Sequence, residues 1–137
     1  MTYPLAFVIE DDPTLNSIFV KAIETAGFRV QTFYDGQIAM DELIQDQPAL
    51  IVLDLHLPHL SGQKILAHVR TLEHLQQTQV IIVSADTKLA EYLRDQAILV
   101  LMKPVSFHQL RQLAARFYGY TGGTTDTNTT FFADGPI

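Results

Sequence analysis

The sequence predicts an α/β protein in which a parallel sheet of five strands is covered by helices on both faces. Two observations lead to this prediction. Five short apolar segments rich in β-branched residues recur along the chain, and segments with the period of an amphipathic helix alternate with them. Because single strands alternate with single helices, neighbouring strands must run parallel through right-handed crossovers. We therefore expect a doubly wound (βα)5 domain.

The predicted strands consist mostly of apolar residues and show little alternation with polar ones. This pattern is typical of strands that are buried on both faces of a sheet. The predicted strands cover residues 5–9, 28–33, 49–55, 80–85 and 97–103.

The first helix is predicted over residues 13–26. Asp12 is placed to cap its N-terminus, Pro13 fits the first turn, and Gly27 ends the helix. One apolar stripe faces the expected core. The stripe consists of Leu15, Ile18, Phe19, Ala22, Ile23 and Ala26.

Four further helices complete the pattern. Three are predicted over 36–46, 62–75 and 87–96, and the last starts at Ser106, which can form a capping box with Gln109. Its apolar stripe consists of Leu110, Leu113, Ala114 and Phe117.

Length and composition favour one domain without a nucleic-acid partner. The chain has 137 residues, of which 47% are hydrophobic, and this is enough for a single core. Its net charge of −6 and scattered basic residues argue against direct binding of nucleic acid. The absence of cysteine excludes disulfides and thiolate zinc sites. With neither a signal peptide nor an apolar run long enough to insert into a membrane, we expect a cytoplasmic protein.

The domain is expected to end near Tyr118. Residues 119–137 are rich in Gly, Thr and other small or polar residues and have no helical period. We interpret residues 1–118 as the domain and 119–137 as a flexible tail.

Chemically useful side chains lie at the carboxyl ends of four of the predicted strands. In a doubly wound sheet, functional groups gather beyond the carboxyl ends of the strands. At an effective dielectric constant of ~20, two negative charges 4 Å apart repel each other by ~4 kcal/mol, so grouped acids call for a cation. The strand-end residues are Glu10, Asp11, Asp54, Ser84 and Lys103.

These residue types suit phosphoryl transfer to a carboxylate. Asp54 would be the nucleophile, and Glu10 and Asp11 would hold Mg²⁺, which prefers oxygen ligands. Lys103 and Ser84 would bind phosphoryl oxygens as a positive charge and as a hydrogen-bond donor.

Four sequence motifs, in this order and at this spacing, resemble the receiver domain of two-component response regulators. The motifs are FVIEDDP, LIVLDLHLPHLSG, VIIVSAD and LMKPV, and the resemblance covers residues 4–118. It implies a flavodoxin-like sheet of strand order 2-1-3-4-5. It also implies that Asp54 takes a phosphoryl group from a histidine kinase or a histidine phosphotransfer protein and slowly hydrolyses the resulting aspartyl phosphate.

The resemblance carries further implications for the site. The backbone carbonyl of His56 would complete the protein ligands of Mg²⁺, and the Lys103-Pro104 peptide bond would be cis. Val100 stands where the family usually has a switch aromatic, so coupling through a turning ring is not expected. We hypothesise that His56 and Asp86 set the lifetime of the phosphorylated state.

The resemblance also suggests partners. We interpret the chain as a stand-alone receiver without an output domain, which docks a downstream protein through the face formed by the helix over 87–96, the strand over 97–103 and the last helix. A homodimer is left open.

Three alternatives remain. A haloacid-dehalogenase-type phosphatase would need a second acid two residues after the nucleophile, where this chain has His56. A flavodoxin-like cofactor binder would need a phosphate-binding loop after the first strand, where acids stand instead. A degenerate receiver would bind partners without being phosphorylated, although the set of site residues is intact.

Overall fold

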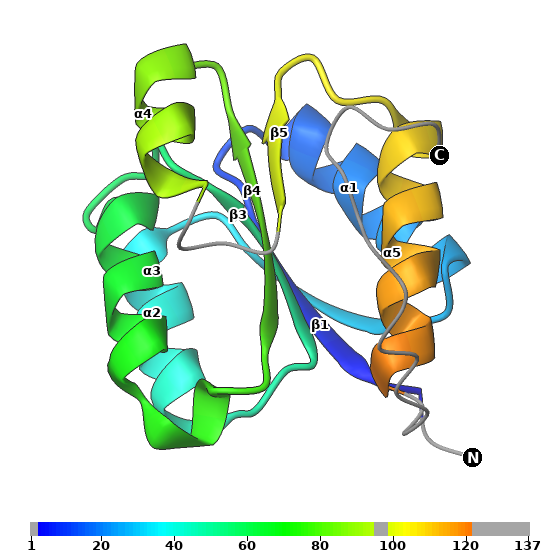
Figure 1. Ribbon diagram of the computed structural model, residues 1–137, viewed down its shortest axis with the longest axis horizontal. Coiled ribbons are helices and arrows are strands. Elements are labelled where there is room, and N and C mark those ends of the chain that lie inside the picture. Colours follow the sequence, from blue (N-terminus) through cyan, green and yellow to red (C-terminus); the bar gives the residue numbers. More distant parts are fainter. Residues whose placement is uncertain (1–2, 95–98, 122–137) are drawn as a thin grey trace.

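A five-stranded parallel sheet forms the centre of the molecule in the computed structural model, which describes residues 3–94 and 99–121 (Figure 1). The strands lie in the order β2-β1-β3-β4-β5, and all neighbours are parallel, as predicted. The strands are β1 (Leu5–Ile9), β2 (Arg29–Phe33), β3 (Leu50–Asp54), β4 (Gln79–Ser84) and β5 (Leu99–Met102).

Helices cover both faces of the sheet. The helices α1 and α5 pack on one face and α2, α3 and α4 on the other (Figure 1). Successive strand residues point to opposite faces, so that in β1 Phe7 packs beneath α2 and α3 while Val8 packs beneath α1 and α5. The helices are α1 (Pro13–Thr25), α2 (Gly36–Gln45), α3 (Gly62–Thr71), α4 (Thr87–Leu93) and α5 (Phe107–Thr121), with a 3₁₀ turn at Glu73–Leu75.

Local signals place several helix ends where the sequence predicts them. The carboxylate of Asp12 accepts hydrogen bonds from the N–H groups of Thr14 and Leu15, and the Ser106 hydroxyl accepts one from Gln109. Gly27 follows α1 with φ of 113°, a left-handed conformation that glycine adopts without steric cost. The peptide bond between Lys103 and Pro104 is cis, as the resemblance implies.

Other details differ from the prediction. The helix expected over 62–75 ends at Thr71, because Leu72 is extended (φ −85°, ψ 119°), and a separate 3₁₀ turn follows. The predicted apolar stripe of α1 includes Ile18, which is 37% exposed, and omits Asn16, which is buried. The last helix continues to Thr121, three residues beyond Tyr118, near which the domain is expected to end. The predicted tail beyond Thr121, like part of the segment between α4 and β5, lies outside the described residues.

Among the described helices, none has the length and apolar character that a membrane span requires.

Candidate functional site

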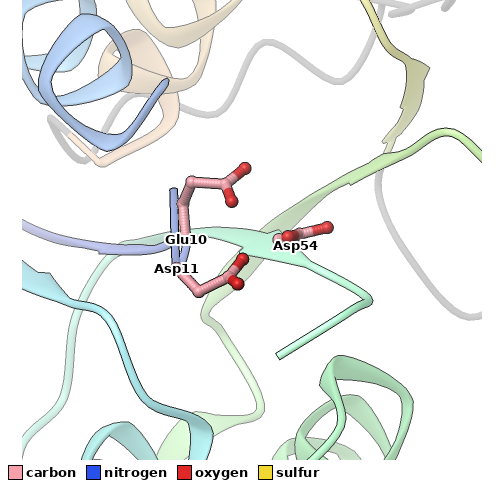
Figure 2. Close-up of side chains that lie close together, drawn as sticks. All are labelled: Glu10, Asp11 and Asp54. Carbon is pink, nitrogen blue, oxygen red and sulfur yellow. The ribbon is translucent and has the colours of Figure 1, made fainter. Parts of the chain in front are cut away.

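Three carboxylates meet at the carboxyl edge of the sheet. Glu10 and Asp11 follow β1, and Asp54 is the last residue of β3, the central strand beside it. Figure 2 shows their side chains at this shared edge, and one oxygen from each lies within 4.8 Å of the others. Glu10 and Asp54 are buried and Asp11 is exposed, so this cluster opens to solvent on one side.

Lys103 joins this cluster from the end of β5. Its Nζ lies 3.1 Å from Oε1 of Glu10 and 3.5 Å from Oδ2 of Asp54. The Lys103 backbone N–H donates to the carbonyl of Ser84, at 2.8 Å, which fixes the start of the following loop against β4. One ammonium group therefore reaches two buried carboxylates that belong to different strands.

Burial and neighbouring charges shift the pKa values of Glu10 and Lys103. Burial, and secondarily the negative charge of Asp54, raises the pKa of Glu10 to about 7 against the opposing effects of the Asp12 N–H and Lys103. Burial alone would lower the pKa of Lys103, but contact with Glu10 and the charge of Asp54 outweigh burial and raise it. The raised pKa of Glu10 therefore reflects mainly its burial, and the raised pKa of Lys103 reflects the two carboxylates beside it.

The cluster fits a divalent cation. Oε1 of Glu10 is buried and, among the described residues, accepts no hydrogen bond of acceptable geometry, although Lys103 lies near it. Carboxylate oxygens are the ligands that Mg²⁺ prefers, and the exposed Asp11 leaves room for the waters that this ion retains. A cation would also offset the repulsion between the Glu10 and Asp54 carboxylates.

Asp54 is held by the loop that follows it. It is 3% exposed, and its Oδ1 accepts a hydrogen bond from the backbone N–H of His56 at 3.3 Å. The N–H of Gly62, at the start of α3, donates to the carbonyl of Leu55 at 3.0 Å. The loop after β3 is therefore hydrogen-bonded back to the end of that strand, and the His56 side chain is exposed.

The remaining predicted residues lie at the end of β4 and within β5. The buried hydroxyl of Ser84 accepts a hydrogen bond from the Asp86 N–H at 2.9 Å. Asp86 itself is exposed and caps α4 through the Leu89 N–H. Val100 is 3% exposed and belongs to the core on the α4 side, together with Ala90.

Two features were not predicted from the sequence. Asn16 is 1% exposed and donates a hydrogen bond to the carbonyl of Glu10, so it belongs to the surroundings of the acids. The available signal was its spacing of three and seven residues before Phe19 and Ile23, which places a polar residue on the buried stripe. In addition, the carboxylate of Asp35, which caps α2, pairs with the ring of His59 in the loop after β3.

Comparisons with known proteins agree with this architecture. A family model described as the response regulator receiver domain matches residues 6–115. The probable methanogenesis regulatory protein FilR2 of Methanothrix harundinacea is 26% identical over 127 residues, which cover 85% of this chain and 82% of that protein. The receiver domain of the Francisella response regulator 1452 has 27% sequence identity and a TM-score of 0.75, with 86% of this chain and 98% of that one covered.

Many relatives are longer than the present chain. The DNA-binding dual master transcriptional regulator RpaA of Synechocystis is 33% identical over 82 residues, covering 60% of this chain and 34% of that protein. Six curated relatives, RpaA among them, are matched over 11% to 59% of their length.

Proposed function

The chain belongs to the response regulator receiver domain family, and from this premise we propose that it accepts a phosphoryl group on Asp54 and signals through regulated contacts with other proteins. The observation that carries the proposal is the reach of Lys103 to Glu10 and Asp54, beside the exposed acid Asp11. A nucleophilic carboxylate, an acidic cation site and a fixed positive charge together provide what phosphoryl transfer requires.

The chain's own residues have distinct parts in the proposed reaction. A carboxylate oxygen of Asp54 attacks the phosphorus of a phosphohistidine donor and forms an O–P bond. The P–N bond breaks, and its electron pair returns to the imidazole of the donor. The Lys103 ammonium stabilises negative charge on the phosphoryl oxygens. The Ser84 hydroxyl would donate to another of these oxygens, turning its O–H away from the Asp86 carbonyl, to which it now donates at 3.5 Å.

Glu10, Asp11 and Asp54 would hold Mg²⁺, together with the backbone carbonyl of His56. When bound, the ion would supply positive charge that neutralises the transferring group. Glu10 and Asp11 would then act as metal ligands and not as a general acid or a general base.

The proposal is tested by incubating the protein with acetyl phosphate and following its intact mass. We expect the protein to gain one phosphoryl group in the presence of Mg²⁺ and to remain unmodified when Mg²⁺ is removed with EDTA. A protein that folds and yet gains no mass with Mg²⁺ would instead be a degenerate receiver.

Replacement of Lys103 by methionine is expected to slow phosphorylation by about 100-fold. Methionine has similar length but cannot offset the charge that develops on the phosphoryl oxygens, and loss of one such group typically costs about 10²- to 10³-fold in rate. The measurement is the time course of intact mass with acetyl phosphate. Lys64→Met, an exposed lysine of α3, should react at the wild-type rate, and an equally fast Lys103→Met would refute the role of Lys103.

The lifetime of the phosphorylated state is proposed to depend on His56 and Asp86, whose side chains are exposed and which follow the site residues Asp54 and Ser84 by two positions in the sequence. We expect His56→Asn to change the rate of dephosphorylation, because the side chain two residues after the nucleophile flanks the path of the attacking water. The rate is measured by the decay of the phosphorylated mass after removal of the donor. Equal rates would reject this role.

Partners follow from the same proposal. The donor would be a histidine kinase or a histidine phosphotransfer protein, and the output would pass through the face of α4, β5 and α5. Tyr92 of α4 supports this choice, since it is 67% exposed and offers an aromatic contact. A donor that draws its phosphoryl group from ATP favours a cytoplasmic location.

A further inference from the structure

We propose that Asn16 is a positioning residue for the divalent-cation site, through its hold on the backbone of Glu10. The inference rests on the proposed function, because it concerns the ion that Glu10 and Asp11 would bind. Neither the strand-end pattern nor the family resemblance points to Asn16. The evidence lies in its burial and in its hydrogen bonds.

Asn16 fixes the end of β1. Its Nδ2 donates to the carbonyl of Glu10 at 2.9 Å and to the carbonyl of Phe33 at 3.2 Å. The Phe33 carbonyl also accepts from the backbone N–H of Glu10 at 3.0 Å. The N–H and the carbonyl of Glu10 are therefore both held, one directly by β2 and the other by Asn16, in a ring of three buried hydrogen bonds.

The orientation of the Asn16 amide is determined by its partners. Both carbonyls can only accept, so the amide nitrogen must face them. The hydroxyl of Thr32, on the edge strand β2, donates to the Oδ1 of Asn16 on the opposite side. An apolar residue at position 16 would leave the carbonyls without this donor, and a carboxylate would place oxygen against oxygen. Asparagine satisfies every one of these contacts.

The position of the Glu10 backbone determines where its carboxylate lies. Oε2 of Glu10 accepts from the N–H of Asp12 at 3.2 Å, and Oε1 lies toward Lys103. This turn of chain also carries Asp11, so loss of the anchor would displace both acids relative to Asp54. Residues that hold metal ligands in place typically contribute about 10- to 100-fold to metal affinity.

The test measures the dissociation constant for Mg²⁺ by isothermal titration calorimetry, with unfolding in urea recorded for each variant. Asn16→Leu keeps the approximate volume and removes both polar groups, so we expect about 10-fold weaker binding. Thr32→Val removes only the hydroxyl that donates to Oδ1 of Asn16, so it should weaken Mg²⁺ binding less than Asn16→Leu does. Thr32→Ser keeps this hydroxyl and should bind Mg²⁺ with the wild-type affinity.

The matched control is Thr78→Val. Thr78 is 4% exposed and its hydroxyl donates to the carbonyl of Pro48 at 2.7 Å, just before β4 and thus at the opposite end of the sheet. Its loss should lower stability without changing Mg²⁺ affinity, which separates positioning of the site from stability of the fold.

The outcomes distinguish the inference from the function on which it rests. Wild-type affinity in Asn16→Leu, or equal weakening in Thr78→Val, would overturn the role of Asn16 alone. If Asn16→Leu does not fold, the comparison of Thr32→Val with Thr32→Ser tests the role of Asn16 instead. Equal Mg²⁺ affinities in these two variants would also overturn that role. A wild-type protein that binds no Mg²⁺, or whose binding survives Asp11→Asn, would overturn the proposed cation site and the inference with it.

Discussion

Asp54→Asn is expected to abolish phosphoryl acceptance from acetyl phosphate while the protein remains folded. The amide that replaces the carboxylate has almost the same shape, and its oxygen can still accept the hydrogen bond from His56. It carries no negative charge, however, and an amide oxygen is a far weaker nucleophile than a carboxylate oxygen. The buried neighbour Glu10 would lose a repelling charge, so no collapse of the site is expected.

The measurement is intact mass after incubation with acetyl phosphate and Mg²⁺, together with circular dichroism to confirm folding. The matched control is Asp41→Asn, an exposed carboxylate of α2 whose Oδ1 accepts a hydrogen bond from the Gln37 side chain and whose amide oxygen can still accept it. This control should gain one phosphoryl group as the wild type does. If Asp54→Asn gains the same mass, the acceptor lies elsewhere and the proposed assignment of Asp54 is wrong.

The sequence predicted the part of the site that depends on strand order. Because the carboxyl ends of parallel strands share one edge, acids after two strands and a lysine after a third could be expected to meet, and Lys103 does contact Glu10 and Asp54. Short apolar runs and helical periods are sufficient for this step, since both depend on residues close together in the sequence.

The sequence could not predict features that depend on packing between distant segments. Asn16 is buried where its amide donates to the carbonyls of Glu10 and Phe33, and the second of these belongs to another strand. The break after Thr71 is equally hard to foresee, because the apolar pattern continues through Leu72 and Leu75 while the backbone turns. For Asn16, a local pattern is overridden by contacts that only the folded chain provides.

Gly62→Ala is expected to destabilise the protein by about 3 kcal/mol or more, although alanine is the better helix former by about 1 kcal/mol. Gly62 is the first residue of α3 and is buried against the end of β3. A Cβ at this position would lie 2.1 Å from the carbonyl oxygen of Asp54 and 2.7 Å from the Cα of Leu55. Both neighbours are backbone atoms, so no side-chain rotation can relieve the overlap.

The clash would reach the site as well as the fold. To admit a methyl group, either α3 must move out or the backbone of Asp54 must shift, and the second change would also slow phosphorylation in the surviving folded molecules. Urea unfolding gives the stability, with Gln63→Ala as control because Gln63 is the exposed next residue of α3 and should change stability by less than about 0.5 kcal/mol. An unfolding midpoint for Gly62→Ala equal to that of Gln63→Ala would show that the strand end and the helix are not packed as tightly as described. It would then remove the steric reason for glycine directly after the Asp54 loop.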